Sequence, residues 1–572
     1  METFGVHMFY FVIWLFISSY GAKTGQDDSP VVSTVTGQVR GTTAHTTDLP
    51  DKPIYVFLGI LYAAPPVGEL RYRPPQPALP WEGVREAVDY GSYCPQNLLY
   101  FNMIDFPIKL GVNMTMSEDC LTLNIFTPTA AIDTNLPVLL WIHGGALSVG
   151  MGSFPGFESL AAHQDVVVVS FNYRLGVLGF LSTGDETIPG NYGLLDQVRA
   201  MVWVKENIRN FGGDPERVTI FGDSAGGVSV SYHLLSPLSK GLFQRAISQS
   251  GVYKTMPVNP QPLQMTKMLS EAVGCDAKDT AAIATCLKEK SVDELLEKVA
   301  PIQQMLGLLT FLPVVDGVFL KSDPVDPTQT KTEVNTADYL LGVNNHVFGW
   351  IMLPAIQRDP LVGISKEDFI KFVKAVTLLS YQDNPNLDKM VDTIVAEYQH
   401  PTTPEDPMAI LFQLSHAFGD FMFVGPTVLA ADKHADAGGR VFLYENQYRP
   451  SIHPNRPDWV GCDHMDDLFM MLGLPFVEVL ETPINYSKTD GHVSLSMMAY
   501  WANFARTGDP SDSTGGPTDS PSLPTWPQYT PDNPVYMKLD VVPTTDVGLK
   551  PDKVKLWNEI IPDLAAVKKD EL

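Results

Sequence analysis

Apolar runs of strand length alternate with helical patterns in the middle of this chain. Pro137–Ile142, Asp165–Phe171 and the shorter Val218–Phe221 are mainly β-branched, leucine or aromatic runs. Such runs are typical of strands that are buried on both faces. Tyr192–Phe211 and Val228–Leu235 carry apolar residues at helical spacing instead. The alternation predicts an α/β fold with a mostly parallel sheet covered by helices on both faces.

The same patterns extend the prediction toward both ends of the chain. Val31–Arg40 alternates in the manner of an N-terminal hairpin, and Tyr339–Val343 and Val441–Tyr444 are expected to be later strands. Val292–Val299 and Lys366–Leu378 have helical patterns and are expected to form a cap over the edge of the sheet. The central sheet is therefore expected to carry large helical insertions.

Two segments lack any packing pattern. Asp51–Pro80 is rich in proline and glycine, and Ser511–Pro524 is rich in serine, threonine, glycine and proline. Both are expected to be irregular surface loops. No internal repeat and no dividing linker is evident, so we interpret the 572 residues as one large domain with insertions.

A sharp turn is predicted between the strand Val218–Phe221 and the helix that follows it. The turn has the sequence Gly222-Asp-Ser-Ala-Gly226, the G-x-S-x-G pattern of a nucleophile elbow. Its glycines have no Cβ, so strand and helix can approach closely and hold Ser224 in a strained, exposed position. The N-terminus of the helix then directs backbone N–H groups toward an oxyanion. Ser224 is the candidate nucleophile.

Both ends of the chain carry targeting signals. The apolar run Met8–Ile17 is too short to span a bilayer and predicts a signal peptide over residues 1–22, although no Lys or Arg precedes it. Lys569–Leu572 reads Lys-Asp-Glu-Leu, the address that a receptor of the endoplasmic reticulum recognises. We expect a protein of the endoplasmic reticulum lumen, with Asn113 and Asn485 in sequons for glycosylation.

Charge and hydropathy exclude two classes of partner. The formal net charge is −26, which argues against nucleic acid and anionic membrane surfaces. No stretch after the signal peptide reaches membrane-spanning length without a charge, so stable membrane insertion is not expected.

Five cysteines are present, so an even subset should pair in an oxidising lumen and leave one thiol. Cys94 with Cys120 and Cys275 with Cys286 are the pairs that close local loops, which leaves Cys462 free. No C-x-x-C or paired-histidine spacing accompanies these residues, so no metal site is expected.

Two long motifs resemble signatures of the type-B carboxylesterase and cholinesterase family. They are Phe211–Gly226 and Glu118–Pro128, and the likeness runs from Val31 to Trp557. Further matches are Phe171–Gly176, Phe311–Gly317 and Trp501–Pro510. The resemblance implies an α/β-hydrolase fold over residues 23–568, both disulfides named above, and hydrolysis of small ester substrates without a cofactor.

Within this family, the carboxylesterases of the endoplasmic reticulum are most similar, because they also end in a retention tetrapeptide. The cholinesterases differ more, since their choline-binding tryptophan lies within the first disulfide loop. Here the loop from Cys94 to Cys120 contains no tryptophan.

The resemblance also implies roles for individual residues. His464, within Gly461–Leu468, matches the catalytic histidine, the base that takes the proton of Ser224. Gly145 and Ala146 match two donors of the oxyanion hole, and Ala225 supplies the third. Alanine stands at 146 where these carboxylesterases usually have glycine, which keeps the N–H but narrows the acyl side of the pocket.

The family's catalytic glutamate is missing. In the run Gly342–Trp350 the flanking residues match, but Val347 occupies the position of the carboxylate. Asp338 precedes the strand and Asp359 lies well beyond the loop, so neither is placed to replace it. Asp223 stands for the family's glutamate beside the nucleophile and keeps its charge.

Valine cannot orient His464, and in a serine protease the change of the triad acid to its amide lowers kcat about 10⁴-fold. Two hypotheses follow. The first is a lumenal carboxylesterase with impaired catalysis, and the second is a protein that binds apolar ligands or a protein partner without useful turnover. Retention of Ser224, His464 and the oxyanion run favours the esterase.

Overall fold

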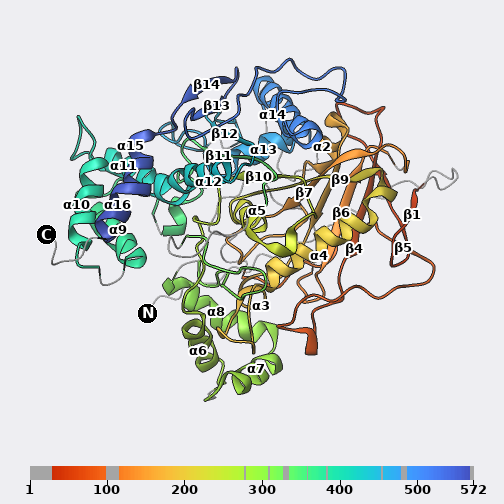
Figure 1. The fold of residues 1–572 in the computed structure, drawn as a ribbon, viewed down its shortest axis with the longest axis horizontal. Helices are drawn as coiled ribbons and strands as arrows, with labels where there is room; N and C mark the ends of the chain where they lie inside the picture. The colour runs from red at the N-terminus through yellow and green to blue at the C-terminus, as the bar shows by residue number, and fades with distance from the viewer. Residues whose placement is uncertain are drawn as a thin grey trace, which may run out of the picture.

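One large sheet runs through the middle of the molecule (Figure 1). The computed structural model describes residues 29–97, 115–129, 131–275, 278–306, 309–325, 334–356, 358–381, 384–452, 455–477 and 486–566, and within them this sheet has eleven strands. In spatial order they are β14 (Thr544–Val547), β13 (Val535–Leu539), β12 (Val441–Asn446), β11 (Asp338–Asn344), β10 (Arg245–Gln249), β9 (Gly213–Asp223), β7 (Leu136–Ile142), β8 (Val167–Phe171), β6 (Thr122–Thr127), β4 (Ile54–Leu61) and β3 (Thr42–Ala44).

The strands from β13 to β8 are parallel, and those at the two edges are antiparallel. A mostly parallel sheet was predicted, and this prediction is confirmed. A separate small sheet contains β1 (Val31–Ser33), β2 (Gln38–Arg40) and β5 (Val84–Glu86). The pairing of β1 with β2 is the hairpin expected at Val31–Arg40.

Helices cover both faces of the large sheet, and the side chains of β7 alternate between these two faces. Its Val138 and Leu140 pack into one core, whereas Leu139 and Trp141 pack into the other. The first core lies under α3 (Gly176–Phe180), α4 (Tyr192–Asn207), α5 (Ala225–Leu235) and α12 (Gly425–Asp436); the second lies under α2 (Phe157–Gln164), α13 (Asp466–Met471) and α14 (Lys488–Thr507). Two buried faces explain why the central strands are continuous apolar runs.

The segment Asp51–Pro80 was expected to be an irregular loop, and this prediction is wrong. It contains β4, whose Ile54 and Phe57 are fully buried. The strand is an eight-residue run of mainly apolar residues, and the prolines and glycines around it led to the prediction of a loop. Gly59 lies at a register shift in the pairing of β4 with β6, so the strand bends there without ending.

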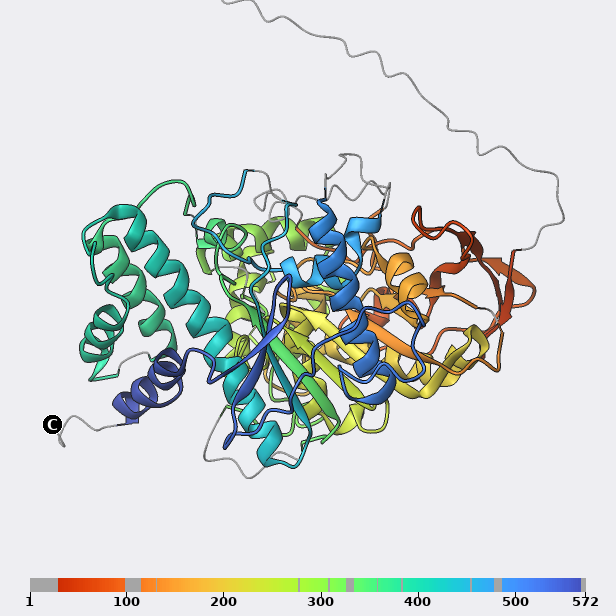
Figure 2. The ribbon, with the colours of Figure 1, turned by 90° about the horizontal axis from the view of Figure 1, so that it is seen from above.

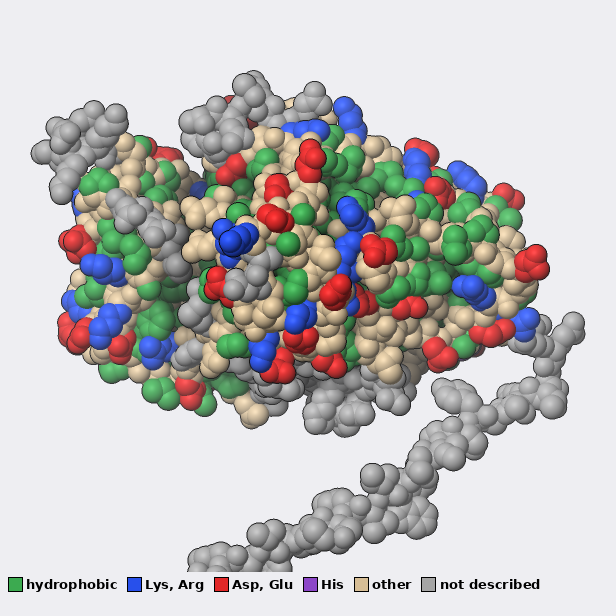
Figure 3. Space-filling model, turned by 90° about the horizontal axis from the view of Figure 1, so that it is seen from below, with side chains coloured by type: hydrophobic (Ala, Val, Ile, Leu, Met, Phe, Trp, Pro, Cys, Tyr) green, Lys and Arg blue, Asp and Glu red, His purple; other side chains and the backbone are tan. Residues whose placement is uncertain are grey.

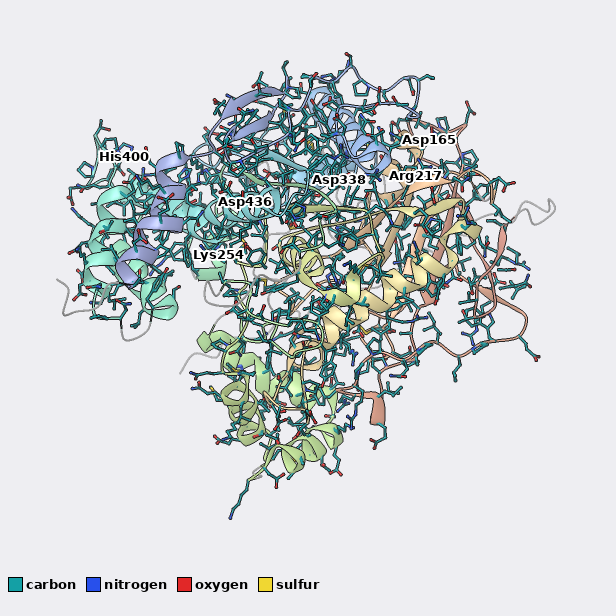
Figure 4. The ribbon with its side chains drawn as sticks, in the orientation of Figure 1. Asp165, Arg217, Lys254, Asp338, His400 and Asp436 are labelled. Carbon is teal, nitrogen blue, oxygen red and sulfur yellow. A yellow bond between two sulfur atoms is a disulfide. The ribbon has the colours of Figure 1, made fainter. Side chains whose placement is uncertain are left out.

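Two helical lobes are inserted after strands of the sheet, where the cap was expected. The first follows β10 and contains α6 (Pro262–Ala272), α7 (Thr280–Glu289) and α8 (Val292–Leu306). The second follows β11 and contains α9 (Lys366–Ser380), α10 (Leu387–Glu397) and α11 (Pro407–Gly419). It stands beside the sheet together with the C-terminal α15 (Pro551–Lys555) and α16 (Ile561–Ala566) (Figure 2). His400 lies at the outer end of this second lobe (Figure 4).

A long helical run leads from the second lobe back to the sheet. It joins α11, the π-helical turn η5 (Asp420–Val424) and α12. By length and composition Pro407–Asp436 is apolar enough to cross a membrane, but 61% of its most apolar window is buried inside the fold. Asp420 in its middle accepts hydrogen bonds from Tyr398 and Lys550. These contacts are those of a core helix.

The structure contains both expected disulfides, Cys94–Cys120 and Cys275–Cys286, and Cys462 is a buried free thiol. The predicted signal peptide at 1–22, the tetrapeptide at 569–572, and the sequons at Asn113 and Asn485 lie outside the described residues.

Acidic and basic side chains are interspersed over the face seen in Figure 3. Several surface lysines lie beside acids; Lys371 is 2.8 Å from Glu367 and Lys374 is 2.8 Å from Asp388. These exposed pairs add little to stability, but they leave fewer basic groups available to a polyanion. The absence of a nucleic-acid partner stays a prediction.

Candidate active site

Ser224 occupies the predicted turn between β9 and α5. Its backbone angles are φ 57° and ψ −126°, an uncommon conformation for a residue with a side chain. A Cβ at Gly222 or at Gly226 would collide with the carbonyl oxygen of Ile142. The Ser224 N–H donates to the carbonyl of Gln249, 2.9 Å away. The close packing of three strand ends therefore fixes the strained turn.

The loop after β7 lies against this turn. A Cβ at Gly144 would lie 3.2 Å from the Cβ of Ser224. The next two residues have positive φ, 104° at Gly145 and 55° at Ala146. In the described part of the chain, the N–H groups of these two residues donate to no protein acceptor. Ala225 begins α5, so its N–H is among those that a helix leaves without an internal partner. The three expected oxyanion donors thus belong to two adjacent backbone segments.

His464 lies between β12 and α13 and is 3% exposed. Its Nε2 is 4.0 Å from Oδ2 of Asp223, and its ring centroid is 5.3 Å from that of Phe423. Its Nδ1 is buried and has no hydrogen-bond partner among the described residues. Burial lowers the pKa of His464 to about 4, so the imidazole is neutral at pH 7. The ring nitrogen that a triad acid would engage is therefore unpaired.

Val347 lies in the loop just beyond the end of β11 and is 2% exposed. Its Cγ1 is 3.2 Å from the position of a Cβ at Gly419, so apolar packing fills this site. Asp338 lies at the opposite end of β11, where it pairs with Arg440 (Figure 4). Asp359 is exposed on a loop and accepts a nearby backbone N–H. Among the described residues, neither acid lies within 4.0 Å of a ring nitrogen of His464.

Three buried acids are close neighbours of His464 in the sequence, and their carboxylate oxygens accept hydrogen bonds. Asp463 accepts the backbone N–H of His464, and Asp466 binds Arg456 through both carboxylate oxygens at 2.6 and 2.8 Å. Asp467 accepts from Gln249, Asn344 and Tyr444 at 2.6–3.0 Å. These carboxylates hold loops and strand ends together.

Asp223 differs from these three acids. It is 1% exposed, and its Oδ1 has no hydrogen-bond partner in the described part of the chain. Burial, reinforced by the charge of Asp467, raises its pKa well above the usual range. Its Oδ2 makes the one acidic contact within 4.0 Å of the His464 ring among the described residues. Asp223 is therefore the acid best placed to respond to charge on His464.

No group of three or more His, Cys, Asp and Glu side chains that could hold a metal ion occurs within the described residues. The Cys462 thiol lies near the side chains of Asn344 and Asn446 at 3.3 and 2.9 Å, and burial raises its pKa. It is a packed group rather than a reactive thiolate.

Sequence patterns did not predict the roles of two residues that shape the base side of the site. His346 and Asp463 link the loop after β11 to the loop that carries His464. Both lie within motifs already singled out, but their partners are more than 100 positions away in the chain. No local pattern reveals such contacts.

Comparison of the chain with known proteins identifies its relatives. Residues 28–557 match the Carboxylesterase family. Carboxylesterase 1D of Rattus norvegicus is 39% identical over 566 residues, which cover 96% of each chain. Pyrethroid hydrolase Ces2e of Rattus norvegicus is 38% identical, covering 96% of this chain and 93% of its own. The medium-chain fatty acyl-CoA hydrolase precursor of Anas platyrhynchos is 38% identical, covering 94% and 93%.

The family match covers nearly the whole described fold, and each of these relatives aligns over more than nine-tenths of both chains. The mostly parallel sheet, covered on both faces, is the architecture of an α/β-hydrolase. The expected resemblance is confirmed, and the chain belongs to the carboxylesterase family.

Proposed function

We propose that this protein hydrolyses carboxylic esters through an acyl-enzyme on Ser224, with His464 as general base. One observation carries the proposal: Ser224 lies at positive φ between β9 and α5, beside a loop in which the N–H groups of Gly145 and Ala146 donate to no acceptor among the described residues. The names of its relatives, which include carboxylesterases and a fatty acyl-CoA hydrolase precursor, support the same reaction class.

We propose the following steps, which are supported by the contact of His464 with Asp223, the residue next to Ser224. His464 Nε2 takes the hydroxyl proton as Oγ of Ser224 forms a bond to the ester carbonyl carbon. The N–H groups of Gly145, Ala146 and Ala225 stabilise the negative oxygen of the tetrahedral intermediate. The imidazolium then protonates the alkoxy group, which leaves as the alcohol. Water, deprotonated by His464, attacks the acyl carbon and releases the carboxylic acid and free Ser224.

The least favourable feature of this mechanism is the positive charge that forms on the buried His464 ring. Burial lowers its pKa from 6.5 to about 4, which disfavours the imidazolium by about 3 kcal/mol. A carboxylate at position 347 would offset that penalty and fix the tautomer, but Val347 does neither. We therefore propose that hydrolysis is slow, with acylation of Ser224 as the impaired step.

Asp223 offers partial compensation. When Nε2 gains a proton, the positive charge forms 4.0 Å from Asp223 Oδ2 and favours the ionised carboxyl group. The raised pKa of Asp223 means that this ionisation itself requires free energy. We infer that Asp223 supplies less stabilisation than an ionised acid behind Nδ1 would supply.

One alternative has a specific observation in its favour. Val347 and the unpaired Nδ1 of His464 also suit a protein that binds apolar ligands or a protein partner without turnover. The two proposals differ in whether Ser224 is a nucleophile.

A fluorophosphonate probe distinguishes the two proposals. It phosphonylates a serine only when that serine is activated, so the parent protein is expected to be labelled and Ser224→Ala is not. Hydrolysis of a short-chain aryl ester is measured on the same two proteins, with circular dichroism to compare their folds. An unlabelled, well-folded parent would reject the esterase and favour the binding protein.

The proposed location is the lumen of the endoplasmic reticulum, and both disulfides suit an oxidising compartment. We propose that residues 1–22 are removed as a signal peptide, that residues 23–568 form the hydrolase domain, and that residues 569–572 are read by the retention receptor. Asn113 and Asn485 are the proposed glycosylation sites. Deletion of the last four residues should cause secretion of a glycosidase-sensitive protein; continued retention would reject the address.

A further inference from the structure

The side chain of His346 bridges the loop after β11 and the loop that carries His464. His346 is 5% exposed. Its backbone N–H donates to the carbonyl of Cys462 at 2.9 Å, and its Nδ1 accepts the N–H of Gly461 at 3.1 Å. These two contacts fix the backbone just before His464 relative to the loop in which the family acid is missing.

A third contact fixes the tautomer of His346. Ser415, on α11, donates its hydroxyl hydrogen to the carbonyl of Phe348 at 2.7 Å. Its oxygen lies 2.8 Å from His346 Nε2, so this nitrogen must be the donor in that pair. The neutral imidazole with hydrogen on Nε2 satisfies every contact, whereas hydrogen on Nδ1 would oppose the N–H of Gly461.

Packing keeps this imidazole neutral and immobile. Its ring stacks on His416 with centroids 4.6 Å apart, and the rings of Phe412 and Trp459 lie edge-on at 5.3 and 5.4 Å. Burial, together with the nearby His416, lowers the pKa of His346 to about 2. The bridge is thus unchanged over the whole pH range in which an esterase is assayed.

Asp463 joins the same two loops at a second point. Its Oδ1 accepts the N–H of Gly349 at 3.1 Å, and its Oδ2 accepts that of Ile351 at 2.8 Å. Oδ1 also accepts the N–H of His464 itself at 2.8 Å. The backbone on both sides of Val347 is therefore tied to the backbone on both sides of Cys462.

We propose that His346 is a positioning residue that holds His464 toward Ser224 in a site without a triad acid. In serine hydrolases the carboxylate behind the imidazole orients the ring. Here Nδ1 of His464 has no partner in the described residues, so its orientation depends on its backbone and on packing. This inference rests on the proposed function for its kinetic consequence, but the bridge itself can be tested without turnover.

Two substitutions separate the two hydrogen bonds of the ring. In His346→Asn the amide oxygen lies near the place of Nδ1 and keeps the acceptor for Gly461. In His346→Gln the amide nitrogen lies near the place of Nε2 and keeps the donor for Ser415 instead. Both variants lose the aromatic packing, so they form a matched pair: His346→Asn keeps the link to the His464 loop and loses the link to Ser415, whereas His346→Gln does the reverse.

Kinetics and hydrogen exchange are measured on both variants and on Ser415→Ala, which removes the hydrogen bonds of Ser415 to His346 and to the carbonyl of Phe348 but keeps the contact of His346 with Gly461. A displacement of about 1 Å can lower kcat about 10²-fold, so we expect His346→Gln to lower kcat ~10–100-fold with KM within twofold. His346→Asn and Ser415→Ala should stay within about threefold of the parent. Exchange of the amides in 459–464 should accelerate in His346→Gln more than in the other two proteins.

The outcomes separate this inference from the proposed function. If the Asn and Gln variants lose kcat equally, with equal exchange in 459–464, His346 is a packing residue and the inference is overturned. If none of the proteins accepts the fluorophosphonate or hydrolyses esters, the proposed function fails. In that case slower exchange in the Asn than in the Gln variant supports the bridge, and equal exchange rejects it.

Discussion

The two halves of this site are built by different means. On the nucleophile side, backbone contacts too close for any Cβ force the chain through Gly222, Ser224 and Gly226. On the base side, hydrogen bonds from side chains tie the His464 loop to the loop of Val347. The second half ends at Nδ1 of His464, which has no hydrogen-bond partner among the described residues.

Under the proposed function, this difference illustrates how a catalytic site can lose one group and keep its frame. Steric packing at the elbow tolerates little change, because each added atom collides with a neighbouring strand. A hydrogen-bonded frame can lose a single acceptor if apolar packing fills the space, as Val347 does beside Gly419.

The elbow should be the most sensitive position. Gly226→Ala places a methyl group against the carbonyl oxygen of Ile142, so strand and helix must separate. We expect fluorophosphonate labelling of Ser224 to fall at least 10³-fold and stability to fall by about 1–3 kcal/mol. Labelling rates and thermal unfolding are measured together.

The matched control is Gly241→Ala, since Gly241 also has positive φ, 80°, but a Cβ there meets no atom within 4 Å. It should lose about 1 kcal/mol of stability from backbone strain and keep the parent's labelling rate. Equal labelling of the Gly226→Ala protein and this control would show that the tight elbow is unnecessary.

Sequence patterns predicted the parts of the molecule that local physics determines. The strands β7, β8 and β9 were found because burial on both faces leaves continuous apolar runs. The strand β4 was missed because prolines flank it and Gly59 interrupts it. The strand β14 has no signal, since each of its residues is exposed. The strands that could be predicted are therefore those whose burial requires apolar residues along their whole length.

The same distinction holds within the site. Ser224 was predictable because its motif encodes a steric requirement within five neighbouring residues. The family resemblance predicted the roles of His464 and of position 347. The bridge by His346 joins segments over 100 residues apart, which no local pattern encodes. The lack of a partner for His464 Nδ1 among the described residues is likewise a property of the folded chain.

Restoring the missing acid should produce the next largest effect, and in the opposite direction. Val347→Glu places a carboxyl group at the position that matches the family's catalytic acid, where we expect it to stabilise the His464 imidazolium and fix its tautomer. We expect kcat/KM on a short-chain aryl ester to rise ~10–1000-fold, less than a full restoration, because the apolar surroundings of Val347 lack hydrogen-bond partners for the carboxylate.

Val347→Gln is the control, because its side chain has nearly the same shape without the charge. It should not exceed the parent's rate. A gain shared by both variants would show that the benefit comes from shape or altered packing. A folded Val347→Glu protein no faster than an already active parent would mean that another group, with Asp223 as the first candidate, already serves His464.

The pH dependence should sharpen the same comparison. His464 must be neutral to act as base, and burial lowers its pKa to about 4. The parent's kcat/KM should therefore rise with pH through about 4 and be constant from pH 6 to 8. An ionised carboxylate beside the ring favours the imidazolium and raises the pKa, so Val347→Glu should move this acid limb to higher pH. If the acid limb of kcat/KM lay at the same pH in Val347→Glu as in the parent, a direct interaction between the introduced carboxylate and His464 would be contradicted.

The smallest effect is expected on the nucleophile side, where one residue departs from a steric ideal. Ala146 has φ 55°, and its side chain makes this conformation unfavourable by about 1 kcal/mol relative to glycine. Ala146→Gly removes this strain but gives the unfolded chain more freedom, worth about 0.4–1 kcal/mol, so stability should change by less than ~1 kcal/mol. The N–H donor remains, and kcat/KM for an acetyl ester should stay within about threefold.

The methyl group of Ala146 should matter for larger acyl groups. It lies on the loop beside Ser224, so its removal should raise kcat/KM for a branched acyl ester relative to the acetyl ester. The ratio of these two rate constants, in parent and variant, is the measurement. A loss above tenfold on both esters would show that the methyl group holds the oxyanion loop in place, and that this half of the site also depends on a side chain.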